Sequence, residues 1–262
     1  MNQAARRAAI VVLLSCYVSL LPAGAQAATC SATSPPGTTA LIELYTSEGC
    51  DSCPPADRWL STLKRGKASS SQVVALAFHV DYWDRLGWQD RYASPQFSRR
   101  QNEQVRLSGG RTVYTPQVLL SGREFRNWQD GDAYAAAVRA INARPAKATL
   151  TVKLRSDPGG AWSADLSGTT QNANVLAYVA VYENGLSSDV AAGENRGKRL
   201  AHDSVVRDWI GPLKIVSGSG FQATAPLPQR TGINYAQGGV AAFLQDATNG
   251  EILQAVALDF CR

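Results

Sequence analysis

Two cysteines separated by two residues constrain this chain more than any other feature of its sequence. The stretch GCDSCPPADRWL, residues 49–60, places Cys50 and Cys53 before two prolines and an apolar pattern with helical spacing. Proline is tolerated in the first turn of a helix, so the pattern predicts a helix that begins beside the cysteines. The free amides of residues 51–53 and the helix dipole would stabilise a thiolate on Cys50. Asp51 opposes this effect, because it adds a nearby negative charge.

Residues 1–27 have the pattern of a secretory signal peptide. Arg6 and Arg7 precede an apolar run, residues 10–21, which is followed by the small-residue sequence Ala25-Gln26-Ala27. The run is shorter than the roughly 20 residues that span a bilayer. We therefore predict cleavage after residue 27 and a periplasmic or secreted protein without a membrane span. Leu14-Ser15-Cys16 offers a weaker alternative, a lipoprotein cleavage site.

Cleavage would leave four cysteines, which are Cys30, Cys50, Cys53 and Cys261. An even number of thiols in an oxidising compartment indicates disulfides, and four cysteines allow three connectivities. The most economical connectivity pairs Cys50 with Cys53 and leaves Cys30 to bridge Cys261 as a structural disulfide. That bridge is plausible because chain termini often lie close together.

The charge of the chain is too mild for a nucleic-acid-binding protein. The formal net charge is +5, and loss of Arg6 and Arg7 reduces it to +3, without a basic cluster elsewhere. We expect thiols or disulfides of proteins or small molecules as partners. The sequence indicates no cofactor.

The pattern of apolar residues changes near residue 145. Before it, strand signals at residues 41–45, 73–80 and 118–120 alternate with helix signals, which predicts an α/β domain over residues 28–145. After it, apolar and polar residues alternate with a period of two, and Asn249-Gly250 predicts a hairpin turn. Residues 146–262 are therefore predicted to form an all-β, sandwich-like domain.

Several stretches together resemble one protein family. The element order and the position of the cysteine pair resemble the thioredoxin superfamily. Four segments are more specifically similar to the domain-of-unknown-function 1223 family of secreted bacterial thioredoxin-like proteins: LIELYTSEGCDSCPPAD, AFHVDYWDRLGWQDRYASPQFSRRQ, VYTPQVLLSG and GENRGKRLAHDSVVRD. These segments cover most of the mature chain. The resemblance implies a thioredoxin-like fold for the first domain but no particular substrate.

The resemblance implies roles for three further residues. Thr115-Pro116 matches the cis-proline of the superfamily, where the backbone of Thr115 would bind an extended peptide substrate; the alternative is an ordinary proline at a strand start. Glu43 resembles the buried acid that accepts a proton from the second thiol, although its offset from Cys50 is one residue longer. The alternative is a glutamate that faces solvent at a sheet edge.

The two histidines of the chain are interpreted differently. His79 ends the second predicted strand, at the edge where open α/β sheets place their sites, so it could approach the thiols and bind substrate. Tyr82, Trp83 and Trp88 would line the same cleft, or serve packing instead. His202 is interpreted as part of a structural loop.

These features favour a thiol-disulfide oxidoreductase, in which Cys50 attacks a substrate disulfide and Cys53 resolves the mixed disulfide. One alternative is Cu(I) binding or delivery through Cys50, Cys53 and His79, because thiolates favour that ion. Another is a non-catalytic binding module with structural cysteines. Half of a zinc site is a further option, but His79 and His202 are the only histidines that could complete it.

Overall fold

The computed structural model describes residues 28–65, 72–215, 218–229 and 231–261. The expected signal peptide, residues 1–27, lies outside these residues. None of the helices in the described ranges has the length and apolar character needed to cross a membrane.

The structure contains more strand than helix. The helices are α1 (Pro54–Arg65), η1 (Asp81–Leu86), α2 (Pro95–Leu107), α3 (Gly131–Asn142) and η2 (Tyr235–Gln237), where η denotes a 3-10 helix. The strands are β1 (Thr29–Thr33), β2 (Ala40–Thr46), β3 (Val73–His79), β4 (Gln117–Leu120), β5 (Arg123–Glu124), β6 (Ala148–Ser156), β7 (Trp162–Thr170), β8 (Val175–Glu183), β9 (Leu186–Asp189), β10 (Arg199–His202), β11 (Val205–Ile215), β12 (Gly218–Pro226), β13 (Gly238–Asp246) and β14 (Ile252–Asp259).

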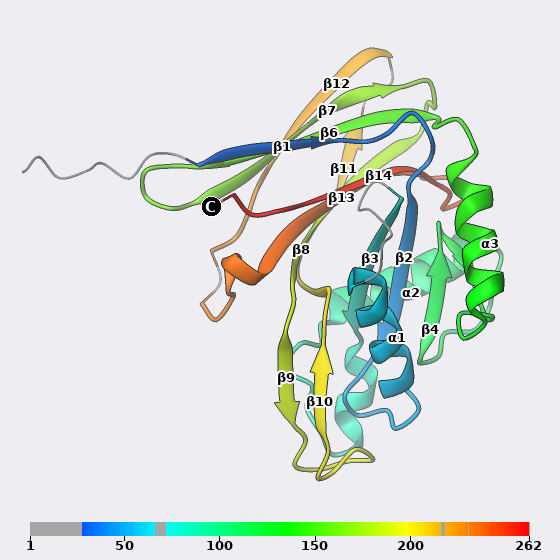
Figure 1. Cartoon of the computed structure of the whole chain (residues 1–262), viewed down its shortest axis with the longest axis vertical. Coiled ribbons are helices and arrows are strands. Elements are labelled where there is room, and N and C mark those ends of the chain that lie inside the picture. Colours follow the sequence, from blue (N-terminus) through cyan, green and yellow to red (C-terminus); the bar gives the residue numbers. More distant parts are fainter. Residues whose placement is uncertain (1–27, 66–71, 216–217, 230, 262) are drawn as a thin grey trace, which may run out of the picture.

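One mixed sheet of eight strands joins the two halves of the chain (Figure 1). Its order is β14-β13-β8-β11-β3-β2-β4-β5. β3 pairs in parallel with β2 and with β11, and the other neighbours in this sheet are antiparallel. A second, antiparallel sheet has the order β1-β6-β7-β12, and β9 and β10 form a separate two-stranded sheet.

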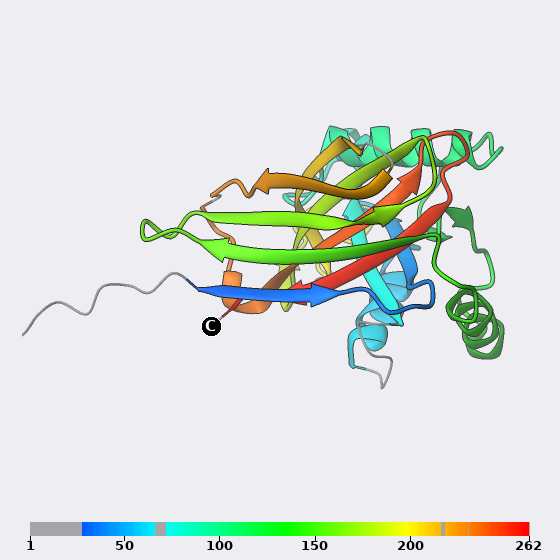
Figure 2. The ribbon, with the colours of Figure 1, turned by 90° about the horizontal axis from the view of Figure 1, so that it is seen from above.

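Three cores hold these layers together. On one face of the large sheet, apolar side chains of both halves pack with α2 around Phe78 and Phe243. On the opposite face, the four-stranded sheet covers β8, β13 and β14, and α1 and α3 cover β2, β3 and β4. Figure 2 shows the four-stranded sheet stacked on the large sheet, with α2 beyond it. Because the central strands are buried on both faces, their sequences are almost continuously apolar.

The predicted fold class, a thioredoxin-like α/β domain followed by an all-β domain, is wrong. Strands account for 44% of the structure and helices for 20%, and strands of both halves share one sheet. β3 would otherwise present an edge of unpaired N–H and C=O groups inside the protein. β11 covers that edge, with Val205 opposite Ala77. Apolar periodicity identifies strands but does not say which strands pair, so the sequence pattern missed this junction. The division of the chain at residues 145 and 146 into two folding units stays a prediction.

The start and the end of the described chain are joined covalently. A disulfide connects Cys30 in β1 to Cys261, which follows β14, with 5.7 Å between their Cα atoms. β1 also pairs with β6. The N-terminal strand therefore belongs to the sheet built by the second half of the chain.

The β9–β10 hairpin, residues 186–202, stands apart from both larger sheets. It leaves the large sheet after β8, returns to it at β11, and contacts α1 on the way. Figure 1 shows the hairpin beside α1, beyond the end of β8. The loop between β9 and β10, residues 190–198, lies near the start of α1.

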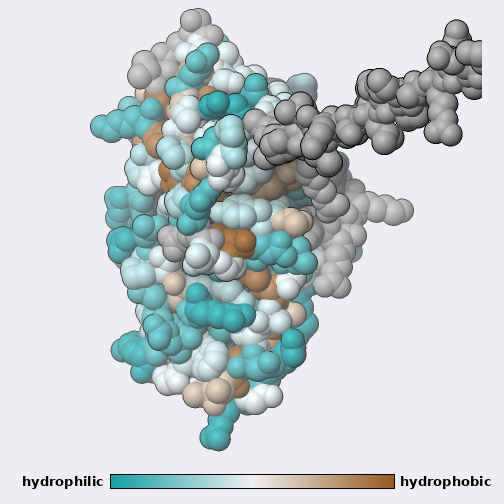
Figure 3. Space-filling view, turned by 90° about the vertical axis from the view of Figure 1, so that its left-hand side faces the viewer, coloured by the Kyte–Doolittle hydropathy of each residue, from teal (hydrophilic) through white to brown (hydrophobic). Residues whose placement is uncertain are grey.

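The surface shown in Figure 3 is largely hydrophilic, with small and separate apolar patches. Among the described residues, Leu86 is the large hydrophobic side chain that is exposed, at 52%. It ends η1, which lies next to the cysteine pair.

Candidate functional site

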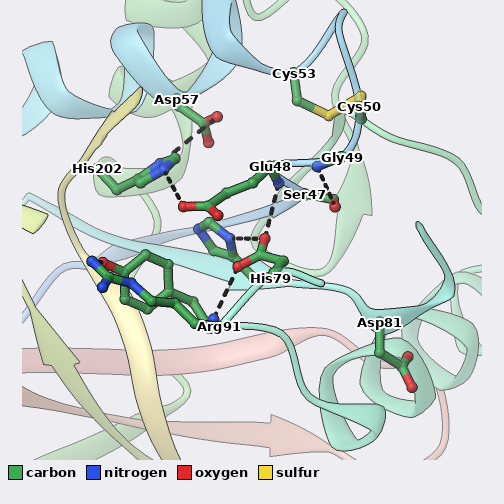
Figure 4. A network of polar contacts seen from close by, with 12 residues as sticks. Ser47, Glu48, Gly49, Cys50, Cys53, Asp57, His79, Asp81, Arg91 and His202 are labelled. Atoms are coloured by element: carbon green, nitrogen blue, oxygen red, sulfur yellow. Dashed lines mark hydrogen bonds and ion pairs between the residues drawn. A yellow bond between two sulfur atoms is a disulfide. The ribbon is translucent and has the colours of Figure 1, made fainter. Parts of the chain in front are cut away.

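The cysteine pair lies at the first turn of α1, as the sequence predicts. Cys50 and Cys53 form a disulfide with 5.5 Å between their Cα atoms. α1 begins at Pro54, and the carbonyl of Cys53 accepts hydrogen bonds from the amides of Ala56 (2.9 Å) and Asp57 (3.2 Å). Figure 4 shows the disulfide beside the start of this helix.

Two of the three amides expected to face Cys50 have other acceptors. The amide of Asp51 donates to Glu194 Oε2 at 3.0 Å, and the amide of Cys53 donates to the Cys50 carbonyl at 3.3 Å. The Ser52 hydroxyl lies 3.3 Å from Cys50 Sγ. In the reduced protein, a hydroxyl at this position would be placed to donate a hydrogen bond to a Cys50 thiolate.

The disulfide is buried. Both cysteines have 0% exposure, whereas Asp51 and Ser52 between them are exposed. Asn195 of the hairpin, itself buried, donates through Nδ2 to the carbonyls of Glu48 (2.9 Å) and Cys50 (2.8 Å). The hairpin therefore covers the loop that carries the disulfide and occupies its backbone acceptors.

A tryptophan joins the cysteine loop to the proline loop. The Thr115–Pro116 peptide bond is cis, as expected. Trp83 Nε1 donates to Thr115 Oγ1 at 2.7 Å, and a Cβ added at Gly49 would lie 3.3 Å from Trp83 Cβ. A side chain at position 49 would therefore crowd the Cβ of Trp83. The structure thus brings Thr115 and the residue before Cys50 together around one side chain.

His79 is buried and belongs to an ion pair. Its Nδ1 lies 2.6 Å from Asp90 Oδ2. Burial by itself lowers the pKa of His79, but the charge and hydrogen bond of Asp90 outweigh burial and hold the pKa above its ordinary value. Burial by itself raises the pKa of Asp90, but His79 outweighs it and holds that pKa below its ordinary value. Asp90 also accepts from the amide of Glu48 at 2.9 Å, so the pair supports the segment before Cys50.

His202 lies between two buried carboxyl groups (Figure 4). Its Nε2 is 3.3 Å from Glu48 Oε1, and its Nδ1 is 4.0 Å from Asp57 Oδ2. Burial raises the pKa of Asp57, and the nearby imidazoles offset this only in part. Burial also favours protonation of Glu48, but neighbours that include His202 outweigh it and lower the pKa of that carboxyl. The rings of His79 and His202 meet edge to face, with centroids 4.9 Å apart.

The cluster contains polar atoms that make no hydrogen bond within the described part of the chain. They are Glu48 Oε1, Asp57 Oδ1, His79 Nε2, His202 Nδ1 and His202 Nε2. Buried polar atoms in native proteins are almost always paired, and a catalytic or redox role is one explanation for an exception. We therefore treat this buried cluster (Glu48, Asp57, His79, Asp90 and His202) as part of the candidate site.

Glu43 is buried on the other face of the sheet. Its neighbours Ile42 and Leu44 face α1, so the alternation of a strand directs Glu43 away from that helix. Its Oε1 pairs with Arg100 Nε of α2 at 3.0 Å and accepts from the Tyr45 hydroxyl at 3.2 Å. The structure does not bring Glu43 to the dithiol; a role in proton transfer stays a prediction.

Sequence reasoning missed most of the buried cluster. Glu48 and Asp57 flank the cysteines in the sequence, and a carboxylate on the apolar side of a predicted helix is a signal that could have identified Asp57. His202 and Asn195 reach the site only through the hairpin, and Asp90 only through the loop after η1. No local pattern indicates that these distant residues meet.

The His79–Asp90 pair is expected to make stability depend on pH. A histidine whose pKa is raised on folding contributes stability below its unfolded pKa, and this contribution is lost as the pH rises through the folded pKa. The free energy of unfolding should thus fall between pH 6 and pH 9. Urea denaturation of wild type and Asp90→Asn at both pH values measures this fall, which should shrink in the variant. An equal fall in both proteins would contradict the assignment; the exposed Asp189→Asn serves as control.

Comparison with known proteins places the chain in a family. The family model described as "Protein of unknown function (DUF1223)" matches residues 41–245. The chain belongs to this family. The match includes the cysteine pair, the cis-proline and the hairpin, so the candidate site lies within the family region. No curated protein matches the chain.

Two solved structures are similar to this DUF1223 protein. Protein AGR_C_4864 from Agrobacterium tumefaciens is 26% identical, with a TM-score of 0.63, over 85% of this chain and 94% of that chain. HBP35 of Porphyromonas gingivalis is 15% identical, with a TM-score of 0.65, over 87% of this chain and 76% of that chain. The second likeness shows the fold alone.

Proposed function

We propose that this protein is a thiol-disulfide oxidoreductase that acts in a periplasmic or extracellular compartment. The observation that carries the proposal is the Cys50–Cys53 disulfide at the first turn of α1, with the Ser52 hydroxyl beside Cys50 Sγ. The second disulfide, Cys30–Cys261, is typical of an oxidising compartment. Thiols or disulfides of proteins or small molecules are the proposed partners.

The reaction follows from the chemistry of a dithiol. The Cys50 thiolate attacks one sulfur of a partner disulfide, and the other partner sulfur leaves as a thiolate with the bonding electron pair. The Cys53 thiolate then attacks Cys50 Sγ, which forms the Cys50–Cys53 disulfide and releases the second partner sulfur as a thiolate. The partner is reduced and the protein is oxidised; the reverse sequence oxidises the partner.

The burial of both sulfurs requires an opening step. Thiol-disulfide exchange needs access to the attacked sulfur, and both cysteines have 0% exposure. The β9–β10 hairpin is the element that we propose opens, because its residues Glu194 and Asn195 bind the cysteine loop through their side chains. In the open protein, Thr115 and Pro116 would contact the partner backbone, and His79 would become accessible.

Trapping a mixed disulfide tests the proposal. Cys53→Ser should accumulate disulfide-linked partners or small thiols on Cys50, because the resolving thiol is absent. Mass spectrometry of a non-reducing digest identifies the linked cysteine. Cys50→Ser should trap far less, and Cys261→Ser serves as a control for an unrelated free thiol. Equal trapping in all three variants would contradict the assignment of Cys50 as nucleophile.

A non-catalytic binding module is the second candidate, and the same burial favours it. A structural disulfide is buried and inert, as this one is in the closed protein. The two candidates differ in what happens when the cysteine pair is reduced. An oxidoreductase remains folded and reacts with disulfides, whereas a protein with a structural disulfide loses stability and does not turn over.

Copper binding through Cys50, Cys53 and His79 gains no support. Within the described ranges, no three or more His, Cys, Asp and Glu side chains are grouped so that they could hold a metal ion. His79 Nδ1 is engaged by Asp90. We therefore do not carry this alternative forward.

A further inference from the structure

His202 is a buried imidazole that the fold does not use for hydrogen bonding. It is 3% exposed, and neither ring nitrogen makes a hydrogen bond with the described residues. Both nitrogens nevertheless lie near carboxyl oxygens, at 3.3 Å from Glu48 and 4.0 Å from Asp57. A histidine that served only structure would be expected to satisfy its nitrogens, because an unpaired buried group costs about 1–3 kcal/mol. Each nitrogen instead faces a carboxyl group without a well-formed hydrogen bond.

Asp57 connects this imidazole to the dithiol. Asp57 lies in the first turn of α1, four residues after Cys53, which immediately precedes the helix; residues with this spacing are neighbours on a helical turn. The amide of Asp57 donates to the Cys53 carbonyl at 3.2 Å, and both side chains are buried. Figure 4 shows the Asp57 carboxyl directed at His202, with Cys53 at the start of the same helix.

We propose that Asp57 and His202 act together as the proton acceptor and donor for the Cys53 thiol. The proposal rests on the proposed function. In the resolving step, the Cys53 thiol gives its proton to this pair, and the resulting thiolate attacks Cys50 Sγ of the mixed disulfide. The bond from Cys50 to the partner sulfur breaks, the Cys50–Cys53 bond forms, and the partner leaves as a thiolate. In the reverse direction the pair returns the proton to Cys53 as that sulfur leaves.

The other candidates for this role are engaged elsewhere. His79 Nδ1 is held by Asp90, and Glu43 faces the far side of the sheet in its pair with Arg100. Burial raises the pKa of Asp57, which makes its carboxylate a stronger proton acceptor. The titratable groups that face His202 come from four segments, and they are Glu48, Asp57, His79 and Tyr92. Asp90, in the same loop as Tyr92, is paired with His79.

The relay spans two elements that are not rigidly joined by a sheet. Asp57 belongs to α1, and His202 belongs to β10, which pairs with β9 alone. Movement of the hairpin that exposes Cys50 would also withdraw His202 from Asp57. Proton transfer at Cys53 therefore requires the hairpin to close again once the mixed disulfide between Cys50 and the partner has formed.

The reaction of the reduced protein with 5,5′-dithiobis(2-nitrobenzoate) separates the two thiols. Attack by Cys50 releases one coloured thiolate, and resolution by Cys53 releases the second. His202→Gln and Asp57→Asn should each slow the second phase at pH 7 by about 100-fold. The variants should approach the wild-type rate as the pH rises, because hydroxide then removes the proton. The first phase should change little.

Matched controls separate a proton role from a structural one. Arg199→Gln alters an exposed side chain of the same strand and should leave both phases unchanged. Added imidazole should restore the second phase in His202→Ala, which a merely structural residue would not allow. An unchanged pH profile of the second phase in a folded His202→Gln protein would overturn the inference while leaving the proposed function intact.

The wild-type protein provides a test that needs no variant. The pH titration of the His202 imidazole, followed by NMR, should differ between the oxidised and the reduced dithiol, because the Cys53 proton is shared with it. Identical titrations would overturn the inference. Loss of the first phase in wild type would instead contradict the proposed function itself.

Discussion

Replacing Arg100 by methionine is expected to lower the free energy of unfolding by about 3–5 kcal/mol, because it leaves a buried carboxylate without its partner. Arg100 Nε lies 3.0 Å from Glu43 Oε1, and both side chains are almost fully buried. Its Nη1 also donates to Gln245 Oε1 at 2.6 Å. The guanidinium stacks on the ring of Tyr178, with 4.9 Å to the centroid. One side chain of α2 therefore joins strands from both halves of the chain.

Urea denaturation with linear extrapolation measures this loss. Arg155→Met is a matched control: it breaks an exposed pair with Asp165 and should cost less than about 1 kcal/mol. The double variant Glu43→Leu, Arg100→Met should recover much of the lost stability, since replacing both members of a buried pair by apolar residues is often neutral. A cost for Arg100→Met as small as that for Arg155→Met would contradict a structural role for the pair.

Replacing Asn195 by alanine is expected to make the Cys50–Cys53 disulfide about 30-fold more reactive toward a small thiol. The change removes two buried hydrogen bonds, to the carbonyls of Glu48 and Cys50. Each contributes about 1 kcal/mol, so the closed hairpin should lose about 2 kcal/mol relative to the open state. Every 1.4 kcal/mol corresponds to a factor of about 10 in the population of the open state.

The rate of disulfide reduction by dithiothreitol, followed by alkylation and mass spectrometry, measures this effect. Arg199→Gln changes the exposed surface of the same hairpin and should react like wild type. Glu194→Gln weakens the contact with the Asp51 amide and should give a smaller increase than Asn195→Ala. If Asn195→Ala reacts no faster than wild type, another element shields the sulfurs, and the hairpin is not the gate.

Local features of the candidate site could be predicted from the sequence. The two prolines after Cys53 predict the start of α1, and the structure begins that helix at Pro54. The cis bond before Pro116 followed from the family resemblance, and it is present. Each of these features depends on a few consecutive residues, whose backbone preferences act without help from distant parts of the chain.

The fold class was not predictable in the same way. β8 and β3 are recognisable as buried strands, but only their packing shows that β11 inserts between them. The alternation of apolar residues along a strand reveals which of its faces is buried. Backbone hydrogen bonding along the edges of the strand leaves no such pattern in the sequence. The same local sequence patterns therefore fit two different folds. One is an α/β domain followed by a separate sandwich, and the other is a single mixed sheet.

The amino-acid sequence by itself determined the position of the dithiol, the helix that starts beside it, and the even number of cysteines after residue 27. Tertiary structure alone decided that the dithiol is buried and that Glu43 belongs to a structural ion pair. It also decided that Asn195 reaches the Cys50 carbonyl, and His202 reaches Asp57, from a distant hairpin. The physical reason is the range of the forces: capping and proline geometry act within one turn of the chain. Burial and pairing of polar groups depend on which surfaces the whole fold brings together.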